Sequence, residues 1–422
     1  MLVLTNLACT FAFVLIPFKM TNPLRFFLLS LLLLSQASWA QTKPKATAAT
    51  KPLSQRMTDS FIAEYPDSLG IQKSRIARWG YEQGVMLTAI ERVGQRTSDP
   101  RYLNYVHKIV DYSVQPDGTI TGYKADDYSV DNIPTGRSIL TLTQKFPKET
   151  KYRKAADLLR QQLITHPRTK EGGFWHKKRY PNQMWLDGLY MVEPFYAEYS
   201  KLFNQPANFD DIAKQFALIE KYCVDSKTGL LYHAYDESKE QKWANKQTGQ
   251  SPNFWSRGMG WYAMALVDVL DYFPKNHPQR VQLIKDLQRL APVLAKYQDP
   301  KTGGWYQVTD QGTRAGNYIE TSSSSMFVYA LAKGVRLGYL DKSFQKVAQQ
   351  GYDGLVKNFI ETAPDGALVM NGTVSVGGLG GDPYRDGSYE YYLSEKIKKN
   401  DFKGVGPFIM ASLEMEMTAK AK

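Results

Sequence analysis

The stretch SKTGLLYH, residues 226–233, contains the element that decides the fold. A polar lysine–threonine pair leads into Gly229, and a short apolar and aromatic run follows it. Glycine next to polar residues marks a turn, and the run after it is of the kind that forms a short extended segment. The same arrangement recurs four times, in PDGTITGY (116–123), KEGGFWH (170–176), PKTGGWYQV (300–308) and PDGALVM (364–370).

The spacing of these turns predicts a closed ring of helical hairpins. Their first glycines are separated by 54, 57, 74 and 63 residues, and one sixth of residues 55–422 is about 61. Such a period accommodates two helices with long connections. We therefore expect an all-α fold, an (α/α)6 barrel in which six hairpins close into a toroid, inner helices line a cavity and long loops cover one rim. An open helical solenoid is the alternative.

The residues between the turns follow helical rather than strand periodicity. Apolar side chains recur at i, i+3, i+4 and i+7. Two clear examples are Met86, Ala89, Ile90 and Val93, and Tyr102, Tyr105, Val106 and Ile109.

The N-terminal residues 1–40 read as a secretory signal peptide, with Met20 as a candidate true start. Arg25 supplies the positive charge, an apolar run follows, and Ala37 to Ala40 form an A-x-A cleavage site. The apolar run is far shorter than the roughly 20 residues that span a bilayer, so we expect no stable membrane insertion after the leader is removed. The protein is expected to be exported to the periplasm.

We expect residues 41–54 to form a flexible lead-in and residues 55–422 to form a single domain. The lead-in offers nothing apolar to bury. Of the formal charge of +12, five positive charges lie in the leader and lead-in, which leaves about +7 on the folded part. This moderate excess suits a small anionic ligand. The sequence contains no compact basic run or nucleic-acid-binding motif, so we expect no nucleic-acid partner.

Cysteine and histidine usage predicts an ordinary hydrophobic core without disulfides or metal. After leader cleavage only Cys223 remains, and a single cysteine cannot form an internal disulfide. No cluster of Cys and His has the spacing of a metal site.

Asp187 is the strongest candidate for catalysis, because it lies inside the apolar and aromatic stretch QMWLDGLYM (183–191). A carboxyl group in such surroundings can hold its proton near neutral pH and donate it. The alternative is that Asp-Gly is a helix-entry turn, with Asp187 capping a helix that begins near Leu189. The local pattern alone favours the cap.

Asp131, in YSVDNIPTGRSIL (128–140), has the same two interpretations. Pro134 and the helical pattern from Gly136 to Phe146 favour an N-cap role. In an α/α toroid, however, the N-termini of inner helices open onto the cavity, so a cap can also be a catalytic carboxylate. Two such acids would allow the division of work that glycoside hydrolases use.

Two histidines and an arginine flanked by tryptophans are further candidates. His176 and His233 each follow a repeated glycine turn and an aromatic residue, at matching places in two repeats. A lone histidine is more often a structural residue than a site residue. Because these two occupy matching positions in the repeats, both roles remain open for them. Arg257, between Trp255 and Trp261, could hold a carboxylate while the indoles stack on a sugar ring. A buried ion pair is the alternative for Arg257.

From about Arg75 to Met415 the sequence resembles the unsaturated glycuronyl hydrolases, in particular the unsaturated rhamnogalacturonyl hydrolases of glycoside hydrolase family 105. The matching stretches follow one another along nearly the whole chain. They are RWGYEQG (78–84), YSVDNIPTGR (128–137), GGFWHKKRYPNQMWLDGLYMVEPFYAEY (172–199), TGLLYHAYDES (228–238), WANKQTGQSPNFWSRGMGWYAMALVDVLD (243–271), GNYIETSSSSMFVYALAKGVR (316–336) and GGLGGDPYRDGSYEYY (377–392).

The resemblance implies a six-hairpin barrel that acts on the unsaturated uronic acid left by polysaccharide lyases. An aspartic acid protonates C4 of the C4=C5 double bond, water adds at C5, and the resulting hemiketal opens. On this basis the proton donor falls on Asp187 and the second carboxylate on Asp131. The implied substrate pocket comprises His176, Lys177, His233, Arg257, Trp255, Trp261 and, on a shorter stretch, Trp79 and Tyr81. The resemblance implies no metal and no organic cofactor.

Three functions remain open from the sequence. The first is a hydrolase of unsaturated oligosaccharides from rhamnogalacturonan or pectin. The second keeps this chemistry on unsaturated glucuronyl oligosaccharides of another acidic polysaccharide. The third is a non-catalytic toroid that binds acidic oligosaccharides, which would keep Arg257 and the tryptophans but would not need both carboxylates.

Overall fold

The computed structural model describes residues 51–69 and 79–419, which belong to one compact unit. The predicted signal peptide, and the lead-in as far as residue 50, lie outside the described residues, so export stays a prediction. The first helix begins at Leu53. Within these ranges, no helix combines the length and the apolar character that a membrane crossing requires.

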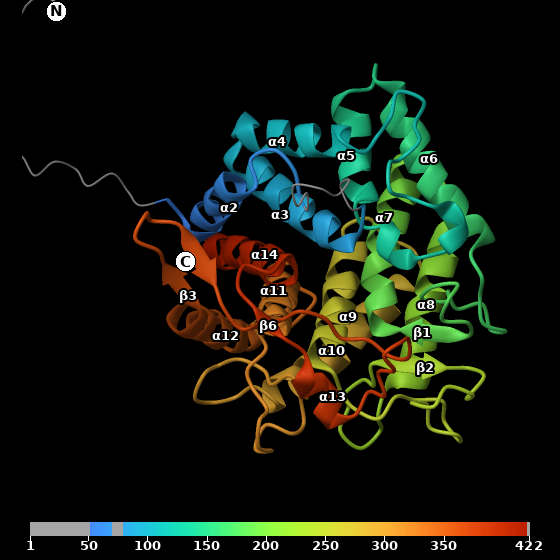
Figure 1. The fold of residues 1–422 in the computed structure, drawn as a ribbon, viewed down its shortest axis with the longest axis vertical. Coiled ribbons are helices and arrows are strands. Elements are labelled where there is room, and N and C mark those ends of the chain that lie inside the picture. Colours follow the sequence, from blue (N-terminus) through green and yellow to red (C-terminus); the bar gives the residue numbers. More distant parts are fainter. Residues whose placement is uncertain (1–50, 70–78, 420–422) are drawn as a thin grey trace, which may run out of the picture. The chain divides into compact units, whose positions relative to one another are not determined.

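Twelve of the described helices alternate along the chain between an outer and an inner set (Figure 1). The outer helices are α2 (Leu53–Glu64), α4 (Pro100–Asp111), α6 (Thr150–Thr165), α8 (Asn208–Cys223), α10 (Arg280–Lys296) and α12 (Phe344–Phe359). The inner helices are α3 (Tyr81–Thr97), α5 (Gly136–Lys145), α7 (Leu186–Leu202), α9 (Ser256–Val269), α11 (Thr321–Arg336) and α14 (Phe402–Ala419).

The inner helices form a closed ring. Each packs against the next along the chain, from α3 through α5, α7, α9 and α11 to α14, and α14 packs against α3. This last contact excludes the open solenoid and confirms the predicted (α/α)6 barrel. Because every inner helix follows an outer one, all six inner helices run in the same direction, and their N-termini meet at one end of the barrel.

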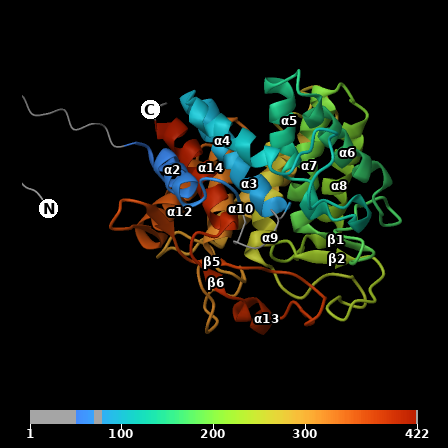
Figure 2. The ribbon, with the colours of Figure 1, turned by 45° about the horizontal axis from the view of Figure 1, so that its top comes forward.

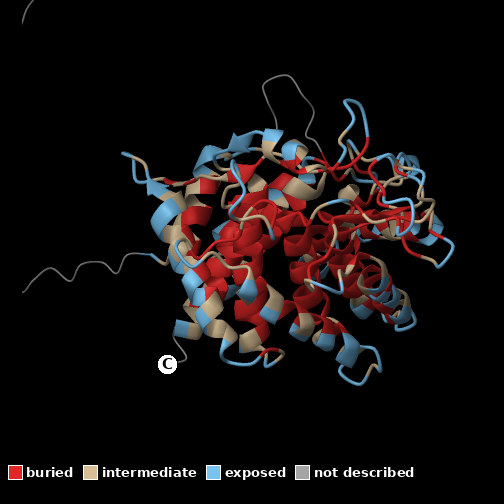
Figure 3. Ribbon diagram, turned by 90° about the horizontal axis from the view of Figure 1, so that it is seen from below, coloured by how far each residue is buried: buried red, intermediate tan, exposed pale blue. Residues whose placement is uncertain are grey.

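The burial pattern explains which helices are inside. All fourteen residues of α9 are buried, whereas α12 buries only Ala348, Gly351 and Leu355. A helix that is apolar around its whole circumference packs inside, and an amphipathic one covers the outside. Buried residues accordingly fill the middle of the unit, and exposed residues lie around it (Figure 3).

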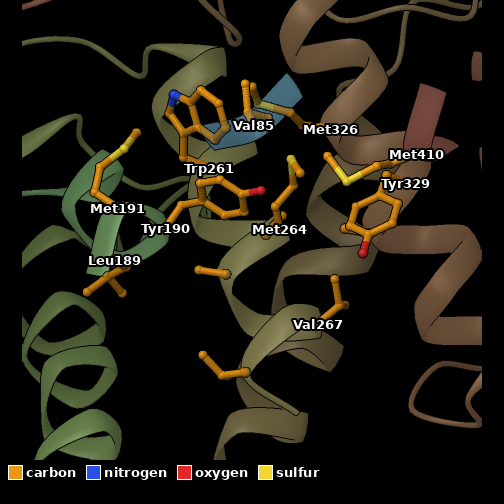
Figure 4. Close-up of a cluster of buried hydrophobic side chains, with 14 of the residues drawn as sticks. Val85, Leu189, Tyr190, Met191, Trp261, Met264, Val267, Met326, Tyr329 and Met410 are labelled. Carbon is orange, nitrogen blue, oxygen red and sulfur yellow. The ribbon is translucent and has the colours of Figure 1, made fainter. Parts of the chain in front are cut away.

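The centre of the barrel is filled by large side chains. Figure 4 shows Met264 between the rings of Tyr190 and Tyr329, with Trp261 at one end of the cluster. Trp261 stacks on Tyr190 with ring centroids 4.8 Å apart, and Met410 of α14 completes the packing beside Tyr329. Dense packing of this kind separates the two ends of the barrel.

The five repeated glycine turns lie where an outer helix connects to the next inner one. Their glycines all have φ between 74° and 96°, a region that residues with a side chain rarely adopt. These residues are Gly118, Gly172, Gly229, Gly303 and Gly366. The run after Gly118, Gly172, Gly229 and Gly366 pairs back across its turn, which confirms the predicted short extended segments.

Short strands and the thirteenth helix gather at one end of the helices (Figure 2). β1 (Gln183–Trp185) pairs antiparallel with β2 (Ala234–Asp236). The remaining elements are β3 (Ile360–Thr362) paired with β4 (Leu368–Met370), β5 (Thr373–Val374) paired with β6 (Ile397–Lys398), the helix α13 (Tyr389–Ser394), and the 3-10 turns η2 (Ala125–Asp127) and η3 (Val130–Asn132).

A buried carboxyl group makes the stability of the fold depend on pH. Burial raises the pKa of Glu91 to about 7. This residue is protonated in both the folded and unfolded chain below about pH 4.5, and above that pH only the unfolded chain loses its proton readily. Between pH 4.5 and 7 the folded state therefore loses up to about 3 kcal/mol from this group. We expect Glu91→Gln to raise the urea midpoint at pH 7.5 and to leave it unchanged at pH 4.

The matched control for this effect is Glu149→Gln. Glu149 precedes α6 and is partly exposed, so its replacement should shift both midpoints by a similar, small amount. Equal midpoint shifts for Glu91→Gln at the two pH values would contradict the assignment.

Candidate active site

The sequence-predicted site residues gather at the N-terminal end of the inner helices. Asp187 lies in the first turn of α7, Arg257 in the first turn of α9, and Asp131 in the connection before α5. The N-terminal ends of helices carry a positive partial charge from their free N–H groups. This end of the barrel therefore favours an anionic ligand.

A two-stranded ribbon brings Asp187 next to His233. β1 ends at Trp185, two residues before Asp187, and Trp185 pairs with Ala234, which follows His233. The N–H of Leu186 then donates to the carbonyl oxygen of His233 at 3.0 Å. The pairing fixes both side chains at the same edge of the site.

The buried oxygen of the Asp187 carboxyl group makes no hydrogen bond to any residue that the structure describes. Its Oδ2 lies 3.3 Å from Nε2 of His233, and the two groups are not aligned for a hydrogen bond. The other ring nitrogen, Nδ1, lies 2.8 Å from the hydroxyl of Tyr392. The side chain of Asp187 is only 12% exposed, so its unbonded oxygen is largely shielded from water. Oδ2 itself is buried against His233, so a substrate would reach the carboxyl group through the part of the side chain that is exposed.

The helix-cap interpretation of the two acids is wrong. α7 begins at Leu186 with Trp185 as its N-cap, so Asp187 is inside the first turn and caps nothing. Asp131 lies in η3, and the N-cap of α5 is Thr135, whose side chain makes no capping hydrogen bond. The start of α7 is determined instead by the strand pairing that precedes it, and the start of α5 by the 3-10 turn that precedes it.

Asp131 makes an ion pair with Lys177 and also faces His176. The Lys177 ammonium donates a short hydrogen bond to its Oδ2, and Nε2 of His176 lies 3.5 Å from its Oδ1. A bridge between Ser129 and Lys177 aligns the two segments, and the N–H of Val130 donates to the carbonyl of His176 at 3.2 Å. Residues 46 positions apart in the sequence are thus held together by backbone pairing.

The charges around Asp131 keep it ionised. Burial is the largest single influence and would raise the pKa of Asp131, but the charge and hydrogen bond of Lys177, together with His176 and Arg179, outweigh it, and the pKa lies below its ordinary value. Burial lowers the pKa of His176 to about 4, so its imidazole is neutral at neutral pH. The site therefore contains a stable carboxylate, Asp131, next to a neutral imidazole.

Removing the charge of Lys177 should shift the pH dependence of the reaction. In Lys177→Met the pKa of Asp131 would rise, because burial remains and the compensating cation is lost. We expect the acidic limb of the kcat/KM profile to move up by about one pH unit and the rate at neutral pH to change much less, because Asp131 stays ionised there. The neighbouring exposed residue offers a control, Lys178→Met, which should leave the limb in place. An unmoved limb in Lys177→Met would refute this role.

Flat side chains stack along the wall of the site. The imidazole of His176 lies parallel to Trp185 with ring centroids 4.4 Å apart, and the ring of Tyr180 stacks on both, at 5.0 Å from Trp185 and 6.5 Å from His176. Trp255 stacks on Tyr392 at 6.0 Å and contacts the ring of His233 at 4.5 Å. Aromatic faces of this kind suit the C–H faces of a sugar ring.

Arg257 is buried and only partly bonded. Its Nη1 donates to the carbonyl of Val374 at 2.6 Å and contacts Ser322 at 3.4 Å, and Glu320 lies at 4.0 Å. Its Nε and Nη2 have no hydrogen-bond partner among the described residues. A buried guanidinium with an unused edge can accept a carboxylate in a bidentate arrangement. The guanidinium carbon lies 5.0 Å from the ring of Trp255.

The remaining predicted residues support the floor of the site. Trp79 donates from its indole nitrogen to the carbonyl of Asn132 at 2.7 Å, which anchors the turn containing Asp131. Tyr81 meets Trp261 edge to face at 6.2 Å. Trp261 belongs to the barrel core described above and is fully buried.

Two residues at this site lie outside the sequence-based set. Tyr392 contacts His233 through its hydroxyl, and burial raises its pKa well above the ordinary tyrosine value, so the hydroxyl stays protonated. Glu320, the N-cap of α11, accepts from the N–H of Ser323 and reaches toward Arg257. Tyr392 follows a glycine-rich loop, and Glu320 precedes a run of serines. Neither residue therefore belongs to a helical or strand pattern that would have marked it as a site residue.

The described residues contain no group of three or more His, Cys, Asp or Glu side chains in an arrangement that could hold a metal ion.

Comparison with known proteins places the chain among carbohydrate-active enzymes. Residues 53–419 match the family described as Glycosyl Hydrolase Family 88. A structure of a glycoside hydrolase from family 105 of C. acetobutylicum ATCC 824 has a TM-score of 0.83 and 50% identity, covering 87% of this chain and all of that one. Protein Atu3128 of Agrobacterium fabrum is 39% identical over 233 residues, 54% of this chain and 99% of the relative. Unsaturated rhamnogalacturonyl hydrolase YesR of Bacillus subtilis is 25% identical over 276 residues, 64% of this chain and 75% of the relative.

Proposed function

The chain belongs to Glycosyl Hydrolase Family 88, the unsaturated glycuronyl hydrolases, and from this premise we propose that it removes a 4,5-unsaturated uronic acid from the non-reducing end of lyase-generated oligosaccharides. The proposal depends on one observation, which is that the site contains two acids in different surroundings. Asp187 has a shielded carboxyl oxygen without a hydrogen bond among the described residues, and Asp131 is ionised next to Lys177. Two carboxyl groups in different surroundings can divide acid and base roles.

Protonation of the double bond is assigned to Asp187. In its protonated form, the Asp187 carboxyl group would give its proton to C4 of the C4=C5 bond, and positive charge would develop at C5 and the ring oxygen. Water then adds to C5 and releases a proton, which returns to the Asp187 carboxylate and restores the acid. The hemiketal at C5 opens to a ketone, and C1 releases the rest of the oligosaccharide as an alcohol. The net reaction consumes one water.

Asp131 would stabilise the charge that develops at C5. A carboxylate that is ionised before the substrate arrives costs no reorganisation when the cation forms. Lys177 and the neutral His176 keep Asp131 ionised and oriented without adding a proton to it. Tyr392 fixes the ring of His233 from the side opposite to Asp187.

Recognition of the uronic acid carboxylate is assigned to Arg257. Its free Nε and Nη2 form the donor pair that a carboxylate matches, and the N-termini of α7, α9 and α11 add positive potential. Trp255 and Trp185 would contact the faces of the sugar.

For the substrate we propose rhamnogalacturonan or pectin oligosaccharides. The name of the Bacillus subtilis relative supports this choice. Lyase elimination removes the stereocentre at C4, so galacturonic and glucuronic acid give the same unsaturated residue. Discrimination between parent polysaccharides therefore depends on the sugar that is released.

A panel of defined unsaturated disaccharides tests the proposal. When the protein is incubated with an unsaturated galacturonyl–rhamnose disaccharide, the ultraviolet absorbance of the double bond should disappear. One molecule of rhamnose should be released for each double bond that is lost. Disappearance only with disaccharides of glucuronyl polysaccharides would keep the chemistry and overturn the rhamnogalacturonan assignment. Unchanged absorbance with every disaccharide would refute the enzyme and favour a binding toroid.

A further inference from the structure

A second cavity lies at the opposite end of the barrel from the candidate active site. Its volume is about 340 Å³, which falls within the usual range for small-molecule sites. It is lined by the C-terminal halves of inner helices and by the start of α5. Glu198 is one of these residues, and it lies eleven positions beyond Asp187 on α7, or about 16 Å along the helix. We call this space the far-end cavity.

The packed centre of the barrel separates the far-end cavity from the catalytic residues. Met264 is fully buried between the two ends, and Tyr329 closes the cluster on the side of the far-end cavity. Figure 4 shows the hydroxyl of Tyr329 directed away from Trp261. The far-end cavity is therefore a separate compartment.

Cationic side chains surround a buried carboxylate at this end. Asp268 is fully buried and accepts from Arg92, Arg137 and Lys333, each at 2.9 Å. Arg92 makes this single ion pair among the described residues. Arg96 lies one turn further along α3, lines the same cavity and is exposed. Two guanidinium groups at i and i+4 thus present unused donors on one helix face.

A carboxyl group in the cavity wall has an unpartnered oxygen. Glu91 is 8% exposed; its Oε2 accepts from Thr141 at 2.9 Å, and its Oε1 has no hydrogen-bond partner among the described residues. A buried polar atom without a partner costs free energy unless a ligand bonds to it. Burial raises the pKa of Glu91 to about 7, so this group adds less than a full negative charge at neutral pH.

Helix ends alone do not account for this arrangement. Cations are favoured at helix C-termini, and that effect explains the presence of Arg96, Lys333 and Arg336. It does not explain a cavity of this size with an unbonded carboxyl oxygen in its wall.

We propose that the far-end cavity binds a small sugar acid, with its carboxylate held by Arg92 and Arg96 and a hydroxyl group held by the carboxyl group of Glu91. Thr88 and Gln95 on the same helix supply further polar contacts, and Met410, Leu413 and Met417 of α14 form an apolar face for the carbon skeleton. This site would be distinct from the proposed active site.

Titration of the full chain with D-galacturonate, followed by calorimetry, tests the proposal. Wild-type protein should bind two molecules, one at each end of the barrel. In Arg96→Glu the far-end event should weaken at least about tenfold, because a charge-assisted contact is replaced by repulsion. Hydrolytic activity should stay unchanged, because Arg96 lies far from Asp187. In Arg257→Lys, binding of galacturonate at the candidate active site should weaken instead, and binding at the far-end cavity should not change.

Controls separate a sugar-acid site from general charge effects. Lys285→Glu reverses an exposed charge on α10, outside the cavity, and should bind as wild type does. D-galactose should not bind at the far end, because it lacks the carboxylate. The proposal is overturned if Arg96→Glu binds two galacturonates with unchanged affinity, if wild type shows a single event that Arg96→Glu leaves unchanged, or if phosphate binds there and galacturonate does not.

Discussion

Replacement of Asp187 by asparagine should reduce turnover by about 1,000-fold or more while leaving substrate binding nearly unchanged. An amide has the shape of the carboxyl group but cannot give a proton to an alkene carbon. Asp187 is shielded, and its Oδ2 makes no hydrogen bond within the described part of the chain, so the substitution leaves the backbone pairing of β1 with β2 intact. The rate would be measured as loss of double-bond absorbance in a single turnover.

Binding in the same variant can be followed by tryptophan fluorescence, because Trp185 and Trp255 lie at the site. Asp210→Asn is the matched control, since Asp210 is a highly exposed carboxylate on α8. That variant should keep the wild-type rate. A near-normal rate in Asp187→Asn would transfer the proton-donor role to another group. A loss of binding with the rate at saturation preserved would make Asp187 a binding residue.

The two acids should respond differently to substitution. Asp131→Asn removes a charge that Lys177 and the positive helix ends compensate, so its loss also leaves Lys177 unpaired. Among the residues that the structure describes, no lysine or arginine pairs with Asp187. This contrast is the physical reason for assigning proton transfer to one acid and charge stabilisation to the other.

The architecture was predictable because it repeats. A positive φ at Gly118, Gly172, Gly229, Gly303 and Gly366 is a local requirement, and each turn leaves the same signal in the sequence. Helical periodicity then placed the helices between the turns. Closure of the ring depends on contacts between α14 and α3, which lie at opposite ends of the described chain, so the spacing alone could not decide between a ring and a solenoid.

The site was predictable in its residue types but not in its contacts. Local rules suggested helix caps for Asp131 and Asp187, and both suggestions failed because long-range pairing overrides local preference. Lys177 reaches Asp131 across 46 residues, and Tyr392 reaches His233 across 159. Such contacts leave no spacing signal in a single sequence.

Arg257→Lys should raise KM for the acidic substrate by about 10- to 100-fold and change kcat much less. Lysine keeps the positive charge next to the buried Glu320, so the fold should tolerate the change. It cannot, however, bond to the carbonyl of Val374 and present two parallel N–H groups to a carboxylate at the same time. Because the carboxylate contact is present in both the ground state and the transition state, its loss appears in KM.

The methyl ester of the same unsaturated substrate isolates this contact. The ester lacks the charge that the Nε and Nη2 edge of Arg257 would bind, so wild type should bind it weakly, and Arg257→Lys should bind it equally weakly. The difference in KM between the two proteins should therefore be large for the acid and small for the ester. Equal losses on both substrates would mean that Arg257 supports the packing of α9 against Glu320 and Val374 rather than the uronic acid carboxylate.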